Sequence, residues 1–231
     1  MLRIVGLWAL LVFGSSALAG GFAVVPLRAD LGKNRTSSLS VTNTEEEAKT
    51  FEVRAVSWKQ ENRTDSYVQT DDLLLAPATF RLEKGASQVV RIQLNRPLDT
   101  AEHAYRVFID EVPVAKEIKP NTLKTVVSMA VPVFVAPASG PIANGQAALK
   151  AALQKDVINI ELSNSGKANL KLREWVLTSA KAGELLKVPS AAYVLSGNTL
   201  TGSYPLRIQA DGPLQLRVIT DRGSFSTDVA R

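Results

Sequence analysis

Residues 121–137 read NTLKTVVSMAVPVFVAP, a long β-prone stretch in which Lys124 is the only charged residue. Successive side chains of a strand point to opposite faces of the sheet, and both faces of this stretch are largely apolar. Pro132 argues against a regular central strand, because proline lacks a backbone donor and is confined in sheets to edges or bulges. The stretch therefore predicts either a core strand with a bulge at the proline or an apolar edge strand, which would recruit another chain.

The composition indicates a folded protein with a substantial core. The 231 residues allow one large or two ordinary domains, and a hydrophobic content of 45% supports burial. Lysine and arginine outnumber aspartate and glutamate by 27 to 22, a diffuse excess that does not indicate nucleic-acid binding. The chain has no cysteine, so its stability has to come from packing and not from disulfides.

The first residues have the pattern of a secretory signal peptide. Arg3 supplies the positive start, Ile4–Phe13 the apolar segment, and Ala17-Leu18-Ala19 a small-x-small cleavage site. The apolar segment is too short to span a membrane comfortably, which disfavours the alternative of an uncleaved anchor. We predict that residues 1–19 are removed on export.

The first part of the mature chain predicts short strands joined by turns. The predicted strands are Phe22–Arg28, Ser38–Asn43, Thr50–Trp58, Thr79–Leu82, Gln88–Leu94 and Tyr105–Val112. Asp71–Pro77 is either a loop or a short edge strand. Together with the stretch quoted first, this number and spacing of strands are typical of an immunoglobulin-like sandwich, which we assign to residues 20–137.

A second domain is predicted after Ala136–Gly145, where Pro, Gly, Ala and Ser cluster as in a linker. Its predicted strands are Val157–Ser163, Lys171–Thr178, Ala191–Leu195, Tyr204–Ile208 and Pro213–Thr220. Ala147–Gln154 is compatible with a turn of helix. Residues 138–231 are thus predicted to form a smaller all-β domain.

The residues that enzymes and metal sites require are scarce. His103 is the only histidine and there is no cysteine, so neither a catalytic triad nor a zinc site is expected. Asp110 and Glu111 are the only adjacent acidic pair considered for acid–base chemistry, but neighbours on a strand point to opposite faces. No glycine-rich phosphate loop is present. We predict a protein that is not an enzyme and uses no cofactor.

Several separated motifs lie along nearly the whole mature chain. They are Pro26-Leu27-Arg28, Val41-Thr42-Asn43, Trp58, Gly85 with Val90-Arg91-Ile92, Glu102 with Tyr105-Arg106, Glu111-Val112-Pro113, Val133-Phe134 and Thr220-Asp221-Arg222-Gly223. With them the chain resembles the periplasmic pilus-assembly chaperones of the chaperone-usher pathway. The segments AVSWKQ and TDDLLLAP are most similar to the archaic branch of that family. The resemblance implies two immunoglobulin-like sandwiches in a boomerang arrangement.

The resemblance also implies a use for the opening stretch. Chaperones of this family lend a strand to pilus subunits that lack their last one, and deliver them in the periplasm to an outer-membrane usher. Such edge addition uses backbone hydrogen bonds for affinity and alternate side chains for specificity. The implied donor residues are Leu123, Thr125, Val127, Met129 and Val131. A register error of one residue would exchange the faces, so the face that contains Val126 is the alternative.

Two charged sites follow from the same resemblance. The family anchors the subunit's terminal carboxylate on a pair of cations, and Arg28 matches the arginine of that pair. Where the better-known branch has a lysine, this chain has Pro132, so the second cation is either supplied by Arg106 or missing. An interdomain ion network that fixes the cleft angle is implied for Arg91, Glu102 and Asp221.

Other functions are weighed against this one. A secreted structural subunit is disfavoured by the two domains and by the lack of an obvious donor extension at the N-terminus. A carbohydrate-binding module would need exposed aromatics, whereas Trp58 and Trp175 fall within strand patterns and are expected in the core. Self-association of the free chain is a further hypothesis, since an unliganded apolar edge needs cover.

Overall fold

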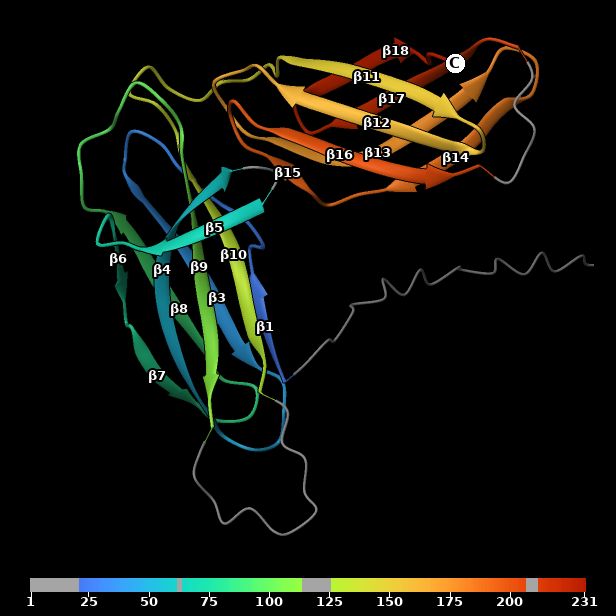
Figure 1. The fold of residues 1–231 in the computed structure, drawn as a ribbon. Coiled ribbons are helices and arrows are strands. Elements are labelled where there is room, and N and C mark those ends of the chain that lie inside the picture. The colour runs from blue at the N-terminus through green and yellow to red at the C-terminus, as the bar shows by residue number, and fades with distance from the viewer. Residues whose placement is uncertain (1–20, 62–63, 114–125, 207–211) are drawn as a thin grey trace, which may run out of the picture.

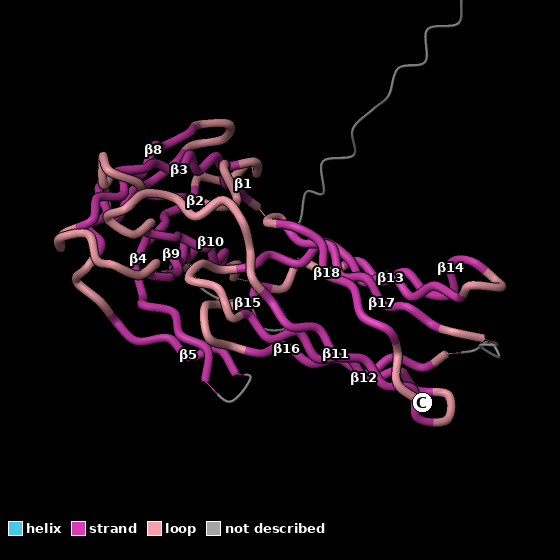
Figure 2. The backbone as a smooth tube through the Cα atoms, turned by 90° about the horizontal axis from the view of Figure 1, so that it is seen from above, coloured by secondary structure: helices cyan, strands magenta, loops and turns pink. Residues whose placement is uncertain are grey.

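The computed structural model describes residues 21–61, 64–113, 126–206 and 212–231. These residues form strands and loops (Figure 2), and no helix among them could cross a membrane. The strands build two β-sandwiches that meet at an angle (Figure 1). The predicted all-β chain with two immunoglobulin-like sandwiches in a boomerang arrangement is confirmed. The predicted signal peptide, residues 1–19, lies outside the described residues.

The first sandwich consists of a four-stranded and a six-stranded sheet. The four-stranded sheet has the order β1 (Phe22–Val25), β3 (Thr36–Asn43), β8 (Ser87–Leu94) and β6 (Leu73–Ala76). The six-stranded sheet has the order β2 (Ala29–Leu31), β10 (Ser128–Val135), β9 (His103–Val112), β4 (Lys49–Glu61) and β5 (Thr64–Gln69), and β7 (Thr79–Leu82) also pairs with β4. The segment predicted as a loop or an edge strand therefore contains strand β6.

Alternation along the strands creates the core of this sandwich. On β9, Tyr105, Val107 and Ile109 are buried between the sheets, whereas Arg106 and Phe108 lie on the outer face. The fully buried side chains of the first core include Phe51, Leu31, Leu39, Ile92 and Leu94. The period of two that the sequence predicts is thus the period that separates core from surface.

The second sandwich also has two sheets. One contains β11 (Ala147–Gln154), β12 (Val157–Asn164) and β16 (Thr199–Pro205) in that order. The other has the order β14 (Gly183–Pro189), β13 (Leu170–Ser179), β17 (Leu214–Thr220) and β18 (Gly223–Asp228), and β15 (Tyr193–Val194) pairs with β13. Its core contains Ile158, Leu162, Leu172, Trp175 and Val218.

Some local expectations differ from the structure. Ala147–Gln154 is strand β11 and not a turn of helix, because every residue of it pairs with β12, and this pairing overrides the helix propensity of alanine. Strands β5 and β14 were not predicted from the sequence. Both are edge strands whose side chains are mostly exposed or half-buried, so they lack the apolar alternation that reveals a half-buried strand.

Strand β10 is central along one part and an edge along the other. Its Val133–Val135 segment lies between β9 and the short parallel strand β2. From Ser128 to Pro132 it pairs with β9 alone among the described residues. The stretch 121–137 therefore contains an edge strand, and Pro132 lies in the edge part of that strand.

The two sandwiches meet through a small aromatic cluster, which we call the junction cluster. It consists of Trp58 and Phe134 of the first sandwich and Tyr193 and Leu195 of the second. The indole of Trp58 lies 6.0 Å from the ring of Phe134 and 5.7 Å from that of Tyr193, measured between ring centroids. Trp58, Phe134 and Leu195 are buried, so the junction is a packed contact between the domains.

Candidate functional site

The outer edge of β10 offers backbone groups that pair with no other strand in the described part of the chain. The N–H of Glu111 donates to the carbonyl of Val127 at 3.1 Å, which places the pair Val127 and Glu111 among the hydrogen-bonded pairs of the ladder. Because such pairs alternate in antiparallel strands, the N–H groups of Ser128 and Ala130 point away from β9. Pro132 occupies the next position of that outer row, where its missing donor breaks no bond to β9.

The inner side chains of this edge part are those of the predicted donor face. Val131 is buried, and Val127 and Met129 are half-buried against the first core. The alternative face contains Val126, which is 47% exposed. Leu123 and Thr125 lie outside the described residues.

Arg106 lies on the outer face directly opposite Pro132, as its partner on the neighbouring strand. Its guanidinium carbon is 4.1 Å from the ring centroid of Trp58, a cation–π distance. One carboxylate faces it: Nη2 is 3.9 Å from Oδ2 of Asp65, too far for a hydrogen bond. The buried Nε of Arg106 has no hydrogen-bond partner among the described residues. Arg106 therefore keeps donors and charge that its surroundings only partly compensate.

Arg28 lies at the other end of the junction cluster. Its guanidinium carbon is 4.6 Å from the ring centroid of Phe134. Nε and Nη2 donate to the carboxylate of Asp30 at 2.8 to 3.1 Å, and Nη1 donates to Oδ2 of Asp221 at 3.0 Å. Burial lowers the pKa of Arg28, but the hydrogen bonds and charge of Asp30 outweigh it, so the pKa lies above its ordinary value. Two carboxylates thus already neutralise Arg28.

The structure brings together two of the three residues predicted for the interdomain ion network. Asp221 accepts from Arg28 and, at 2.9 Å, from the backbone N–H of Lys171. Glu102 accepts from the backbone and side-chain nitrogens of Asn169 at 2.6 and 2.7 Å and lies 3.5 Å from Nη2 of Arg222. Each acid therefore ties its own domain to the other.

The third residue, Arg91, does not belong to this network, which corrects the sequence prediction. Arg91 is exposed on β8 in the four-stranded sheet, and no ion pair of it is found among the described residues. Its place is taken by Arg222, which follows Asp221 in the TDRG turn. The sequence showed this motif but did not tell which arginine would approach Glu102, because that contact joins residues far apart in the chain.

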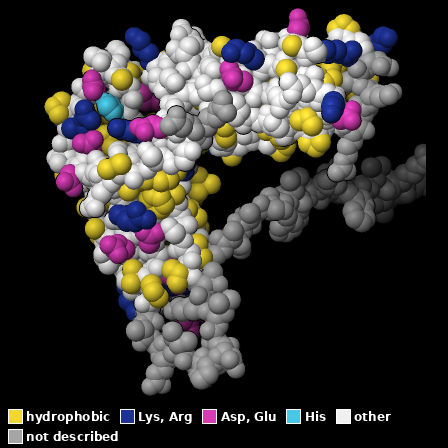
Figure 3. All heavy atoms as spheres, viewed as in Figure 1, with side chains coloured by type: hydrophobic (Ala, Val, Ile, Leu, Met, Phe, Trp, Pro, Cys, Tyr) yellow, Lys and Arg dark blue, Asp and Glu magenta, His cyan; other side chains and the backbone are white. Residues whose placement is uncertain are grey.

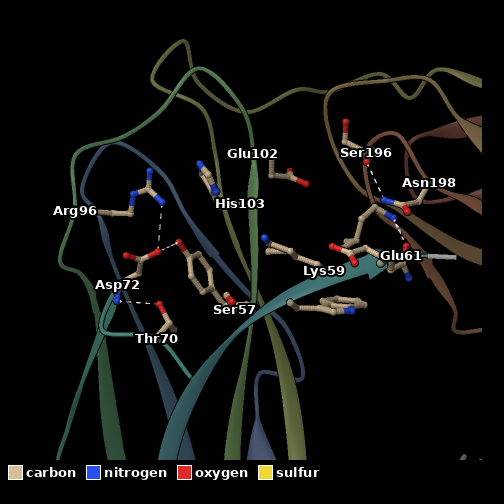
Figure 4. A pocket seen from close by; sticks show the side chains of 15 residues that line it. Ser57, Lys59, Glu61, Thr70, Asp72, Arg96, Glu102, His103, Ser196 and Asn198 are labelled. Carbon is tan, nitrogen blue, oxygen red and sulfur yellow. Dashed lines mark hydrogen bonds and ion pairs between the residues drawn. The ribbon is translucent and has the colours of Figure 1, made fainter. Parts of the chain in front are cut away.

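Polar side chains line a pocket of about 530 Å³ beside the junction (Figure 4). Asp72 accepts from the hydroxyl of Tyr105 at 2.8 Å and from Arg96 at 3.3 Å. Burial, together with Asp72, raises the pKa of Tyr105 to about 12. His103 lies 3.1 Å from Asp99, and no metal-binding group of acids and histidines is found in the described ranges.

The acidic pair and the tryptophans lie as the sequence suggested. Asp110 faces outward and pairs with Arg54 at 2.9 Å, whereas Glu111 is buried and pairs with Lys49 at 3.0 Å, so the two carboxylates lie on opposite faces.

Trp58 is 3% and Trp175 2% exposed, so neither offers a platform for a sugar. Hydrophobic side chains gather instead on the surface below the junction (Figure 3). Among the exposed hydrophobic residues are Tyr67 and Val68 of β5.

The comparisons with known proteins agree with this architecture. Residues 30–141 match the family model described as pili and flagellar-assembly chaperone, PapD N-terminal domain. No curated protein sequence matches the chain.

Solved structures of chaperones share the fold. The complex of the chaperone CsuC with the tip adhesion subunit CsuE, from archaic chaperone-usher Csu pili of Acinetobacter baumannii, has a TM-score of 0.64 at 15% identity and covers 91% of this chain and 99% of its own. The SafB chaperone of Salmonella enterica, in complex with the SafA pilin, gives 0.59 at 18% identity, with 92% and 98% covered. The CupB2 chaperone of Pseudomonas aeruginosa gives 0.54 at 18%, with 90% and 100% covered.

Proposed function

Since its residues 30–141 make the chain a member of the pilus-assembly chaperone family, we propose that it binds pilus subunits by donor-strand complementation. The observation that carries the proposal is the open outer edge of β10 from Ser128 to Pro132. An extended partner strand can add there through the backbone groups of Ser128 and Ala130, while inner side chains such as Met129 enter its groove. The donor segment would continue through Leu123 and Thr125.

We assign the main carboxylate anchor to Arg106. A subunit carboxylate that approaches Arg28 would meet the negative charge of Asp30 and Asp221, which already occupy its donors. Arg106 faces a single carboxylate at 3.9 Å and lies opposite Pro132, the position that bears the lysine in the better-known branch. Charge-assisted hydrogen bonds from those of its donors that Tyr67 does not engage would fix the register of the bound strand.

Arg28 then has a structural role at the contact between the two sandwiches. With Asp221, Glu102 and Arg222 it holds the two sandwiches at one angle, and this angle sets the width of the cleft beside β10. Buried and half-buried ion pairs of this kind specify geometry more than they add stability, because desolvation offsets most of the attraction.

The remaining assignments follow from the family. We propose that residues 1–19 are cleaved, that residues 20–137 and 138–231 are the two domains, and that the mature chain acts in the periplasm. It would hand its subunits to an outer-membrane usher of the archaic type, as the AVSWKQ and TDDLLLAP segments favour. Without a subunit, the open edge of β10 would be covered by self-association at high protein concentration, whereas the dilute free monomer would leave it open.

The experiment that tests the proposal is purification of the mature protein from the periplasm of its own host, with mass spectrometry of what co-elutes. We expect one or more small β-rich secreted proteins with wild type and far less of them with Arg106→Gln. Arg91→Gln is the matched control, because Arg91 is exposed on the other sheet and should leave the yield unchanged. Absence of any co-eluting protein with wild type would contradict the chaperone function.

A further inference from the structure

Gln60, near the end of β4, contacts both the second domain and Asp65, the carboxylate beside the proposed anchor Arg106. The side chain of Gln60 accepts from the backbone N–H of Leu195 at 2.8 Å and donates to the carbonyl of Tyr193 at 3.0 Å. Gln60 thus forms one donated and one accepted hydrogen bond with the backbone of the second domain, as a neighbouring strand would. The same Nε2 donates to Oδ1 of Asp65 at 3.0 Å.

Asp65 is the carboxylate that faces Arg106. Each of its oxygens accepts one hydrogen bond, Oδ1 from Gln60 and Oδ2 from the hydroxyl of Tyr67 at 3.0 Å. Burial and the hydrogen bond to Asp65 raise the pKa of Tyr67, against the opposing charge of Arg106 and its hydrogen bond to the same hydroxyl. The two hydrogen bonds that Asp65 accepts fix the position of the carboxylate, whose Oδ2 lies 3.9 Å from Nη2 of Arg106.

A shorter contact would change the anchor. An aspartate that reached Arg106 at the usual 2.7–2.9 Å or so of a charged hydrogen bond would occupy the donors meant for a ligand. Arg28 shows this outcome within the same molecule, since Asp30 binds it through two nitrogens. The difference between the two arginines therefore depends on what holds Asp65.

We propose that Gln60 is a positioning residue of the anchor: fixed by the backbone of the second domain, it holds Asp65 away from Arg106 and leaves the guanidinium free for a subunit's carboxyl terminus. This inference rests on the proposed function of Arg106. It also makes the anchor depend on the junction, because a change at Tyr193 and Leu195 would release Gln60 and with it Asp65.

The test compares four variants with wild type: Gln60→Leu, Asp65→Asn, the double variant of both, and Gln93→Leu as the matched control. Gln93 is exposed on β8 and no side-chain hydrogen bond of it is found among the described residues. The probe is the small secreted protein that co-purifies with wild type, and its dissociation constant is measured by competition. We expect Gln60→Leu to weaken binding about tenfold, and Gln93→Leu to leave it unchanged.

The double variant separates positioning from a merely structural effect. If Gln60 acts by holding Asp65, replacing that carboxylate removes the competitor, and the double variant should bind within about twofold of Asp65→Asn. A double variant as weak as Gln60→Leu, or a Gln60→Leu that binds like wild type, would overturn the inference.

A second readout needs no partner. The Nε–H resonance of Arg106 should shift in Gln60→Leu, as Asp65 closes on it, and return toward the wild-type position in Gln60→Leu/Asp65→Asn. An unmoved resonance would reject the role of Gln60 even if subunits bind. If wild type retains no subunit but the resonance behaves as expected, the proposed function fails and the positioning of Asp65 stands.

Discussion

The two parts of strand β10 have opposite surroundings. Val133–Val135 is covered by β9 and β2, and Phe134 is packed in the junction cluster against the second domain. Ser128–Pro132 pairs on one side only within the part of the chain that the structure describes. We call Val133–Val135, which is paired on both sides, the held part of β10, and Ser128–Pro132, which is paired on one side, its open part. A partner strand can add to the open part without disturbing the core.

The largest effect is expected at the boundary between the two parts, where Arg106 lies opposite Pro132. Arg106→Gln should weaken subunit binding by about a thousandfold, since losing one partner of a desolvated charge pair costs about 2–5 kcal/mol. The free protein should lose only about 1 kcal/mol, the worth of the contact with Trp58. Competition binding and urea unfolding measure the two quantities, and equal losses in both would show that Arg106 is structural.

The held part should show a pH dependence through Tyr105, the partner of Val133 on β9. Its pKa is raised to about 12 by burial and Asp72, whereas the unfolded chain titrates near 10. Above pH 10 the unfolded state therefore releases the proton first, and the free energy of unfolding should fall by roughly 2 kcal/mol between pH 10 and 12.

Tyr105→Phe isolates this contribution. Lys49 also has a raised pKa, because Glu45 and Glu111 outweigh the effect of its burial, and it lowers stability in the same direction as the pH rises. The variant should thus keep a shallower alkaline decline. Urea unfolding at several pH values measures it, and identical slopes for both proteins would contradict the assignment.

Replacing Arg28 tests whether this residue fixes the angle between the domains or anchors the subunit's carboxylate. Arg28→Gln leaves Asp221 half-buried without its cation, and we expect a loss of about 2 kcal/mol in stability and a changed interdomain angle. Subunit binding should fall far less than with Arg106→Gln. Small-angle scattering and urea unfolding check this, with Arg91→Gln as control, and a loss of binding as large as that of Arg106→Gln would return the anchor to Arg28.

The smallest effect is expected at the open part. Pro132→Ala gives this position a backbone donor, but that donor points away from β9, so the ladder should gain nothing. We expect the free protein to lose at most about 1 kcal/mol, because the unfolded chain becomes more flexible. A clear gain in stability would mean that the outer row of β10 finds a partner in the free chain.

The sequence predicted the sandwiches because alternation is local: Phe51 and Val53 on β4 and Val107 and Ile109 on β9 are buried where the pattern places them. Pro132 likewise narrowed the alternatives to an edge strand or a core strand with a bulge, since proline lacks a backbone donor. Such signals need no knowledge of distant residues, and they sufficed for the fold class and for the strand on which the proposal rests.

The site depended on contacts that no local pattern contains. Whether an arginine is free or neutralised is decided by acids from other strands, as Asp221 shows for Arg28 and Asp65 for Arg106. Gln60 ends the AVSWKQ segment, but the sequence does not show its role, because that role comes from contacts with the backbone of Tyr193 and Leu195. Sequence reasoning therefore placed Arg28 first and Arg106 only as a possible second cation, whereas the acids around them favour the reverse order.

The most direct test of the central claim is hydrogen exchange of single backbone amides on β10, measured by NMR on the free protein and on its complex with a co-purified subunit. In the free monomer, kept below the concentration at which it self-associates, the amides of Ser128 and Ala130 should exchange fast, whereas those of Met129 and Val131, which face β9, should be protected. Binding should slow Ser128 and Ala130 strongly and leave the other two unchanged. If Ser128 and Ala130 exchange equally fast in the complex, no strand adds to this edge, and donor-strand complementation by β10 is wrong.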